Sequence, residues 1–313
     1  MSPILDNLKT YHQYDQSETY QQLSKFSRHF ENGLTDGQSF TLPKNPKEYK
    51  DIVIVTSGKD SHIASFSHSL SPFFLTINLS ISTGARLPSY ANSNSLIICI
   101  SGDGSTSETK STDLEIQAKG IESVNIANQS SAYTFGFLFG LISRFDSTHG
   151  STKSFNNIFS ICEQTINKIQ KEIGQKNNPA KIIASKHTQK AILFFSAGHL
   201  SGVSQYASGQ VVRQAKTFSQ FWDISESKYY IESLFTYPTK VLSEYQVLLL
   251  NSDLYPNNIK ADVDNLKNIF AQKRINYTEI KPDSHDWFEQ IVESVAFFSF
   301  FSYYLSITNK VIL

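Results

Sequence analysis

The chain has 313 residues, which is long for a single hydrophobic core, so its length predicts two domains. Lys plus Arg and Asp plus Glu each total 28, which gives a formal net charge of zero. A neutral chain argues against nucleic acid or an acidic membrane surface as the partner. We expect a small neutral or weakly charged ligand instead.

Cysteine usage and hydropathy predict a cytoplasmic protein. The two cysteines, Cys99 and Cys162, lie in an apolar run and in a helical pattern, which is typical of buried, reduced thiols. The first residues, MSPILDNLKTYHQYDQSE, lack a basic segment followed by an apolar one, so we expect no signal peptide. The most apolar stretch, SVAFFSFFSYYLSI, is too short and too rich in serine for a bilayer span of about 20 residues.

In the first half, a leading helix is followed by alternating apolar and helical runs. Residues 17–33 carry Tyr20, Leu23, Phe26 and Phe30 at helical spacing after Ser17, a good N-cap residue. The runs that follow are DIVIVTS, SHIASFSHSL, FFLTINLS, SLIICIS, SETKSTDLEIQAKG, ESVNIAN and AYTFGFLFGLISRF. Short apolar runs separated by helices indicate parallel strands buried on both faces of a sheet.

The same pattern restarts after a polar segment. The amphipathic stretch SFNNIFSICEQTINKIQKEIG leads into QKNNPAKIIASKHTQ, after which AILFFSAG and YQVLLLNSD read as new strands. We therefore expect a first α/β subdomain with its leading helix over 1–173, a linker over 174–189 and a second α/β subdomain over 190–313. Doubly wound sheets of this kind bind ligands at the carboxyl ends of their strands.

Two strand-to-helix turns of the first half are rich in Gly, Ser and Thr. TSGKDSHIAS follows DIVIV, and SGDGSTSET follows LIICI. Such turns present backbone N–H groups and hydroxyls at a helix N-terminus, where an anion is stabilised. Tight turns use the same residues for steric reasons alone, so the pattern by itself leaves both interpretations open.

The second turn resembles the phosphate loop of the sugar isomerase (SIS) domain, Ser-x-Ser-Gly-x-Thr-x-Glu-Thr. Ser101, Gly104, Thr106, Glu108 and Thr109 match it. The phrases around it, LP followed by EYKDI at 42–52 and LPSY at 87–90, are similar to those of the bifunctional phosphoglucose/phosphomannose isomerases over nearly the whole chain.

This resemblance implies two doubly wound SIS subdomains of three-layer αβα architecture, a carbohydrate ligand and neither a metal nor a cofactor. It also implies a homodimer, because that family builds its site from two subunits. Four aromatic residues near the C-terminus, Phe297, Phe298, Phe300 and Phe301, are expected to be exposed and to be buried by dimerisation. The ligand-binding positions that the resemblance implies are Ser57, Gly58, Ser61, Ser101, Gly104, Ser105, Thr106, Thr109 and Gln290.

Two carboxylates depart from the family pattern in these turns. Asp60 and Asp103 each stand where the family has a serine. A carboxylate close to a phosphate repels it by about 4 kcal/mol per pair of unit charges at an effective dielectric constant near 20. Lys59 offsets part of this repulsion. We therefore expect weakened binding of phosphate, with acceptors suited to sugar hydroxyls or an amine.

The family's catalytic positions also differ here. An ungapped alignment places Phe221 at the family's catalytic Glu and Tyr237 at its His, and neither residue is a useful general base at neutral pH. Glu226 and Glu232 are nearby carboxylates that are either stand-ins for the base or solvated surface residues. His199 and His62, each close to a turn, are candidates for ligand contacts or simple turn residues. Asp286, with His285, is expected to cap the closing helix.

Three functions remain open from the sequence. The first is an SIS-fold protein that binds a sugar or sugar phosphate, with isomerase activity that is weak, altered or absent. The second is a working aldose-ketose sugar-phosphate isomerase with a relocated carboxylate base. The third is a non-catalytic paralogue that acts in regulation or assembly.

Overall fold

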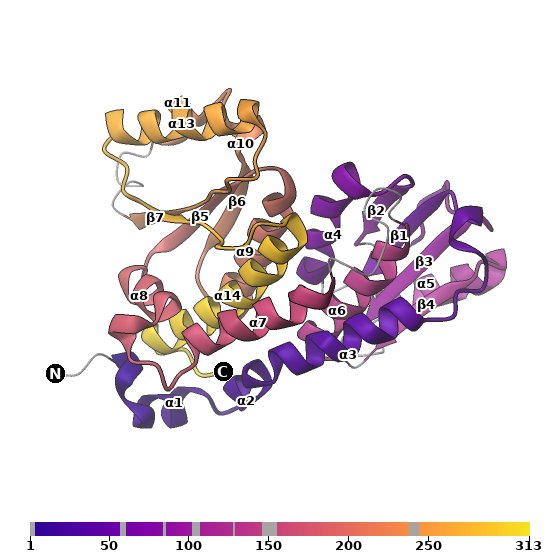
Figure 1. The fold of residues 1–313 in the computed structure, drawn as a ribbon, viewed down its shortest axis with the longest axis horizontal. Coiled ribbons are helices and arrows are strands. Elements are labelled where there is room, and N and C mark those ends of the chain that lie inside the picture. Colours follow the sequence, from indigo (N-terminus) through magenta and orange to yellow (C-terminus); the bar gives the residue numbers. More distant parts are fainter. Residues whose placement is uncertain are drawn as a thin grey trace. The chain divides into compact units, whose positions relative to one another are not determined.

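The computed structural model describes residues 4–56, 61–83, 86–101, 107–127, 129–145, 155–237 and 244–313. The chain divides into two units, drawn in Figure 1. The first-sheet unit is Lys25–Phe159, and the second-sheet unit combines Met1–Ser24 with Ser160–Leu313. Within the segment expected as a linker, 174–189, the short helices η5 (Gln175–Asn177) and α8 (Pro179–Lys186) belong to the second-sheet unit.

The first-sheet unit is built on a parallel sheet with the strand order β2-β1-β3-β4. Because the chain starts at β1 and moves outward in both directions, the topological switch point lies between β1 and β3. The main elements of this unit are α3 (Phe26–Ser39), η2 (Pro46–Glu48), β1 (Asp51–Thr56), α4 (Ser61–Phe74), β2 (Asn78–Ser82), β3 (Ser95–Ser101), α5 (Ser107–Lys119), β4 (Ser123–Ala127), α6 (Ser131–Ile142) and η4 (Ser143–Phe145).

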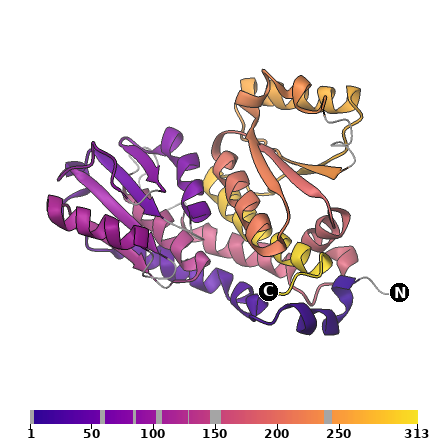
Figure 2. The same cartoon turned by 180° about the vertical axis from the view of Figure 1, so that it is seen from behind.

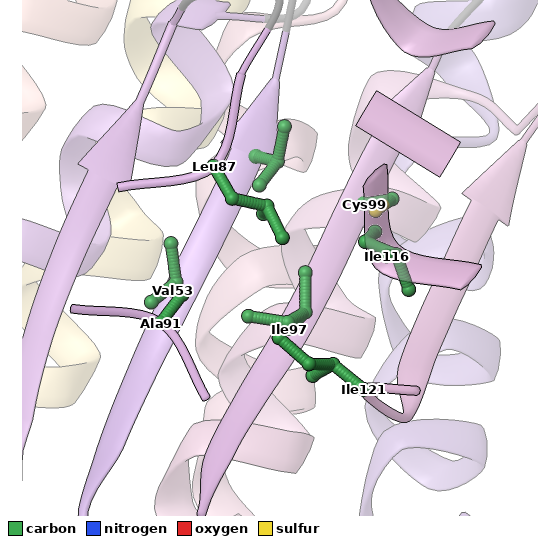
Figure 3. Close-up of a cluster of buried hydrophobic side chains, with 8 residues drawn as sticks. Val53, Leu87, Ala91, Ile97, Cys99, Ile116 and Ile121 are labelled. Carbon is green, nitrogen blue, oxygen red and sulfur yellow. The ribbon is translucent and has the colours of Figure 1, made fainter. Parts of the chain in front are cut away.

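Both faces of the two central strands, β1 and β3, are buried, as their unbroken apolar runs predict. One face forms a cluster with α5 and the loop before β3, in which Val53, Ile97 and Ile116 have at most 4% exposure (Figure 3). Right-handed crossovers place the helix after β1 on the other face. There α4 packs on α6 through Phe66 and Phe135, whose ring centroids lie 4.5 Å apart.

The helices α3 and α6 lie side by side at very short range (Figures 1 and 2). A Cβ atom on Gly136 would overlap the carbonyl oxygen of Phe30 and lie 2.9 Å from the backbone nitrogen of Leu34. Glycines at 33, 37 and 140 face the partner helix backbone in the same way. Only glycine permits this approach at these positions.

The second-sheet unit repeats the topology, with the parallel strand order β6-β5-β7-β8 and a switch point between β5 and β7. The α/β class with two doubly wound parallel sheets is thus confirmed.

The remaining elements of this unit are η1 (Ile4–Asp6), α1 (Leu8–Tyr14), α2 (Thr19–Ser24), α7 (Phe155–Ile169, which crosses the boundary), β5 (Ala191–Ser196), η6 (Gly198–Leu200), α9 (Ser201–Ala215), β6 (Ser219–Asp223), α10 (Ile224–Ser227), α11 (Ile231–Leu234), β7 (Tyr245–Leu250), α13 (Asn257–Gln272), β8 (Tyr277–Ile280) and α14 (Trp287–Thr308).

The closing helix α14 is the core helix of this unit. It begins with Asp286 as N-cap, which accepts a 2.8 Å hydrogen bond from the Phe288 backbone N–H, so the predicted cap is confirmed. Its 22 residues make it long and apolar enough to cross a membrane, but 89% of its most apolar window is buried inside the protein. The expected exposure of its aromatic residues is wrong, because Phe298, Phe300 and Phe301 have 0% exposure within their own chain.

The N-terminal arm, residues 4–24, is anchored in this unit by a buried lysine. Lys181 has 0% exposure, and its Nζ donates to the carbonyl oxygens of Leu5 at 2.8 Å and Lys171 at 2.7 Å. Asp6 Oδ1 lies 3.7 Å away and partly offsets the desolvation that lowers the pKa of Lys181. The arm also pairs with the other end of the chain, since Leu313 N donates to Tyr14 O.

We predict that Gly136→Ala lowers the free energy of unfolding by at least about 2 kcal/mol, because the backbone of α3 leaves no room for a Cβ. The measurement is urea unfolding of the full chain. Gly174→Ala is the matched control, since nothing lies within 4 Å of its Cβ position, and it should change stability by less than about 0.5 kcal/mol. Equal stability of the two variants would contradict the close helix contact.

We predict that Lys181→Met costs about 3 kcal/mol, because it leaves two buried carbonyl oxygens without their shared donor. Limited proteolysis should then cleave the N-terminal arm faster than in the wild type. The control is Lys168→Met, which removes an exposed 3.2 Å ion pair with Asp283 and should cost less than about 1 kcal/mol. Unchanged proteolysis in Lys181→Met would show that the lysine does not hold the arm.

Candidate functional site

The two Gly/Ser/Thr-rich turns follow β1 and β3, the strands on either side of the first switch point. β1 and β3 are adjacent parallel strands, with Thr56 in register with Ile100, so both strands end at the same edge. α4 begins at Ser61 and α5 at Ser107, which places two helix N-termini at that edge. This is the position where doubly wound sheets bind ligands, and the helix dipoles there favour an anion.

Several predicted site residues lie outside the described residues. These are Ser57, Gly58, Gly104, Ser105 and Thr106, together with Lys59, Asp60 and Asp103. Their side-chain arrangement therefore stays a prediction.

The described members of the predicted site frame these turns. Ser61 and His62 open α4 and are half-buried, Ser101 ends β3, and Thr109 lies in the first turn of α5. Thr56, the last residue of β1, has 0% exposure, and its hydroxyl has no hydrogen-bond partner. Buried polar groups nearly always have a hydrogen-bond partner, so the Thr56 hydroxyl is available to a ligand at this edge. The sequence pattern did not identify Thr56 as a candidate.

The switch point of the second sheet is occupied by the protein's own side chains. His199 follows β5, Ser252 follows β7, and Gln290 comes from the first turns of α14; all three have at most 3% exposure. His199 Nε2 lies 2.8 Å from Gln290 Oε1, which also accepts a 2.6 Å hydrogen bond from the Ser252 hydroxyl. Because an amide oxygen only accepts, His199 carries its proton on Nε2.

Aromatic rings complete this cluster. The imidazole of His199 stacks on Trp287, with centroids 5.7 Å apart and an interplanar angle of 14°, and Tyr255 meets its edge at 5.5 Å. The Tyr255 hydroxyl accepts from Ala197 N and donates to Leu250 O, which ties the ends of β5 and β7 together. Gln290, a predicted ligand contact, also donates from its amide to Ser284 O at 2.8 Å.

Burial lowers the pKa of His199 to about 4, an effect that the hydrogen bond to Gln290 and the charge of Asp286 only partly oppose. At neutral pH the ring is therefore uncharged. The second switch point is thus filled by buried, hydrogen-bonded groups of the protein itself.

Of the two residues that align with the family's catalytic positions, one lies inside a strand and the other is exposed. Phe221 is the third residue of the edge strand β6, in register with Phe194. Tyr237 is 80% exposed, and the carboxylates of Glu226 and Glu232 belong to exposed residues of α10 and α11.

The carboxylate at the end of β6 is Asp223, which sequence inspection did not single out. It accepts hydrogen bonds from the Ser201 hydroxyl and, at 2.8 Å, from Ser225 N. The sequence feature that indicates Asp223 is its place as the polar residue at the end of the run SQFWD. Among the residues that the structure describes, no group of three or more His, Cys, Asp or Glu side chains could hold a metal ion.

Comparisons with known proteins agree with this geometry. Residues 176–311 match the family model "Bacterial phospho-glucose isomerase C-terminal SIS domain". A comparison with curated protein sequences gives no match.

Among solved structures, one similar chain is the C-terminal domain of glucosamine-fructose-6-phosphate aminotransferase from Francisella tularensis, with a TM-score of 0.69, 14% identity and coverage of 93% of this chain and 95% of that one. Glucosamine-6-phosphate deaminase from Thermotoga maritima gives a TM-score of 0.66 at 14% identity and covers 95% of each chain. A glucose-6-phosphate isomerase like protein from Thermus thermophilus gives 0.61 at 15% identity, with coverage of 97% and 92%. At these identities the likeness shows the fold.

We predict that His199 makes the chain less stable as the pH falls from 6.5 to 4. The unfolded histidine titrates near 6.5, so the unfolded chain binds the proton before the folded chain does. Between pH 7.5 and pH 5, the stability advantage of the wild type over His199→Gln should shrink by about 2 kcal/mol. Parallel pH dependence of the two proteins in urea unfolding would contradict a buried, neutral His199.

Proposed function

The chain is an SIS-domain protein of the phosphoglucose isomerase-like type, and from this premise we propose that it binds a sugar or a sugar phosphate with isomerase activity that is weak, altered or absent. The observation that supports binding is that α4 and α5 begin at the edge where β1 and β3 end, each after a segment whose sequence is rich in Gly, Ser or Thr. Hydroxyls and backbone N–H groups there suit either a phosphate or a sugar ring.

Low activity is supported by the groups available for proton transfer. Aldose-ketose isomerisation needs a base that moves a proton between two carbons, a step worth about 10² to 10⁴-fold in rate. The family's catalytic Glu and His align with Phe221 and Tyr237, and Asp223 already accepts hydrogen bonds from Ser201 and Ser225. Asp60 and Asp103 add negative charge where a phosphate would bind.

Two other functions remain as alternatives. A working isomerase would use a relocated carboxylate, for which Glu226 and Glu232 are the candidates because both lie close in sequence to Phe221. Their exposure favours the role of solvated surface residues instead. A non-catalytic paralogue would act in regulation or assembly. We also propose a cytoplasmic homodimer, on the basis of the family resemblance alone. The aromatic residues Phe298, Phe300 and Phe301 give no support for a dimer, since they are already buried within the chain itself.

We predict that the purified chain converts fructose 6-phosphate or mannose 6-phosphate far more slowly than an intact phosphoglucose/phosphomannose isomerase. Losing the base costs several kcal/mol of barrier, and each 1.4 kcal/mol is about tenfold in rate. A coupled assay that detects glucose 6-phosphate measures this. Rapid turnover that Glu226→Gln or Glu232→Gln abolishes would favour the relocated base instead.

Ligand binding is tested separately by thermal shift with phosphorylated and free sugars. The double variant Asp60→Ser and Asp103→Ser should raise affinity for 6-phosphosugars by about tenfold or more and leave turnover near zero, because no base is restored. If the double variant binds phosphosugars no better than the wild type, these carboxylates do not face the phosphate. Absence of any sugar-induced shift in both proteins would contradict the proposed function.

A further inference from the structure

A polar groove runs over the first-sheet unit beside the edge strand β4. It consists of two adjoining cavities of about 730 and 390 Å³ that share Asp36, Gln129 and Tyr133. The exposed side of α3 forms one wall, and the end of β4 with the start of α6 forms the other. None of the lining residues is among the ligand positions expected at the β1–β3 turns, and β3 separates β4 from β1 in the sheet.

The charges of the groove do not suit a phosphate. Among the described residues, its lining includes the carboxylates of Glu31 and Asp36 and no lysine or arginine. The imidazole of His29 is mostly uncharged at neutral pH, because burial and the charges of Lys25 and Arg28 lower its pKa. The nearby cations Lys44 and Arg144 line a neighbouring cavity and donate to the backbone carbonyls of Ser93 and Phe40.

Four polar side chains of the groove are held in place by hydrogen bonds within the protein. The Tyr133 hydroxyl, on α6, donates a 2.7 Å hydrogen bond to Asp36 Oδ2 on α3. His29 Nδ1 lies 2.8 Å from the Ser130 hydroxyl, which also accepts from Tyr133 N at 3.2 Å. Fixing these groups in advance reduces the entropy lost when a ligand binds.

Aromatic carbon lies next to these polar groups. The rings of Tyr133 and Phe137 stack with centroids 6.2 Å apart and an interplanar angle of 26°, and Phe40 meets Phe137 edge-on at 5.5 Å. The exposed side chains of Asn125 and Gln129 add planar amides along the β4 side. Each amide offers both donors and acceptors, and a carboxylate accepts from two hydroxyls at once.

A ligand that satisfies this lining has hydroxyls around its edge, apolar C–H groups on its faces and no negative charge. We propose that the groove binds a neutral sugar or short oligosaccharide, at a site separate from the β1–β3 turns. Asp36 and the amides of Asn125 and Gln129 hydrogen-bond its hydroxyls, and the tyrosine ring packs against its C–H face. The combined volume is large enough for more than one sugar ring.

The test is saturation-transfer NMR and calorimetry on the full chain, with glucose, maltose and maltotriose as neutral probes and with glucose 6-phosphate and spermidine as charged ones. We expect maltotriose to bind more tightly than glucose. Tyr133→Phe, which keeps the ring and removes the hydroxyl that holds Asp36, should weaken binding about tenfold. Gln129→Ala, a change in an exposed side chain, should also weaken it and leave the melting temperature unchanged.

The matched control is Tyr90→Phe, which removes the hydroxyl of a 51% exposed tyrosine elsewhere in the same unit, where it hydrogen-bonds to Ser80, and should leave affinity unchanged. Neutral sugar binding should survive in the double variant Asp60→Ser and Asp103→Ser, so the groove and the proposed phosphosugar site can fail independently. The proposal is overturned if no neutral sugar binds, if Tyr133→Phe and Gln129→Ala bind like the wild type, or if spermidine alone binds, which would assign the groove to a cation.

Discussion

The first-sheet unit depends on the direct backbone contact between α3 and α6. α3 comes before β1 and α6 comes after β4, so their contact joins the two ends of the unit around the sheet. Four glycines allow the carbonyl groups of each helix to approach the other without side chains between them. The phenylalanine rings of Phe30, Phe66 and Phe135 then fill the space beside this contact. The same contact brings Asp36 and Tyr133 within hydrogen-bonding distance, so the walls of the polar groove follow from the glycines.

The second-sheet unit contains buried polar side chains at its switch point. Its switch point is filled by His199, Ser252 and Gln290, which hydrogen-bond one another and the backbone. The buried hydroxyl of Ser196, at the end of β5, has no hydrogen-bond partner. Hydrogen bonds between buried polar side chains favour one arrangement of those side chains. The chain thus contains the same sheet topology twice, and in the second-sheet unit buried side chains fill the switch point.

Much of the fold follows from local sequence, because strands that are buried on both faces are continuous apolar runs. The runs DIVIV and LIICI became β1 and β3, and Asp286 capped α14 as its side chain predicts. The helix predicted over 17–33 is divided at Lys25, however, into α2 and α3. Helical periodicity continues across this position without a Gly or Pro, so only tertiary contacts reveal that the two halves belong to different units.

The sequence predicts where the candidate site lies in the fold better than it predicts which residues lie at the strand ends. Turn residues after two adjacent strands identify the β1–β3 edge, since the order of elements fixes where parallel strands end. Asp223 and Ser252 were not predictable in the same way, because a single polar residue after a strand has no distinctive spacing. The burial of Phe298 and Phe301 was missed because an apolar run on a helix indicates burial without saying whether the covering surface belongs to the same chain.

The N-terminal arm has a consequence for the order in which the chain acquires its structure. In sequence terms the first-sheet unit is an insertion, because residues on both sides of it, 4–24 and 160–313, form the other unit. During synthesis the arm emerges before the first-sheet unit, and its partners Lys181, Tyr303 and Leu313 emerge more than 150 residues after it. Domains generally fold as units as they leave the ribosome. The first-sheet unit can therefore complete its own core around α3 and α6 before the partners of the arm are synthesised. During that period Tyr11 and Tyr20, which later pack on Tyr303, are exposed to solvent, and a chaperone that binds the arm would cover them.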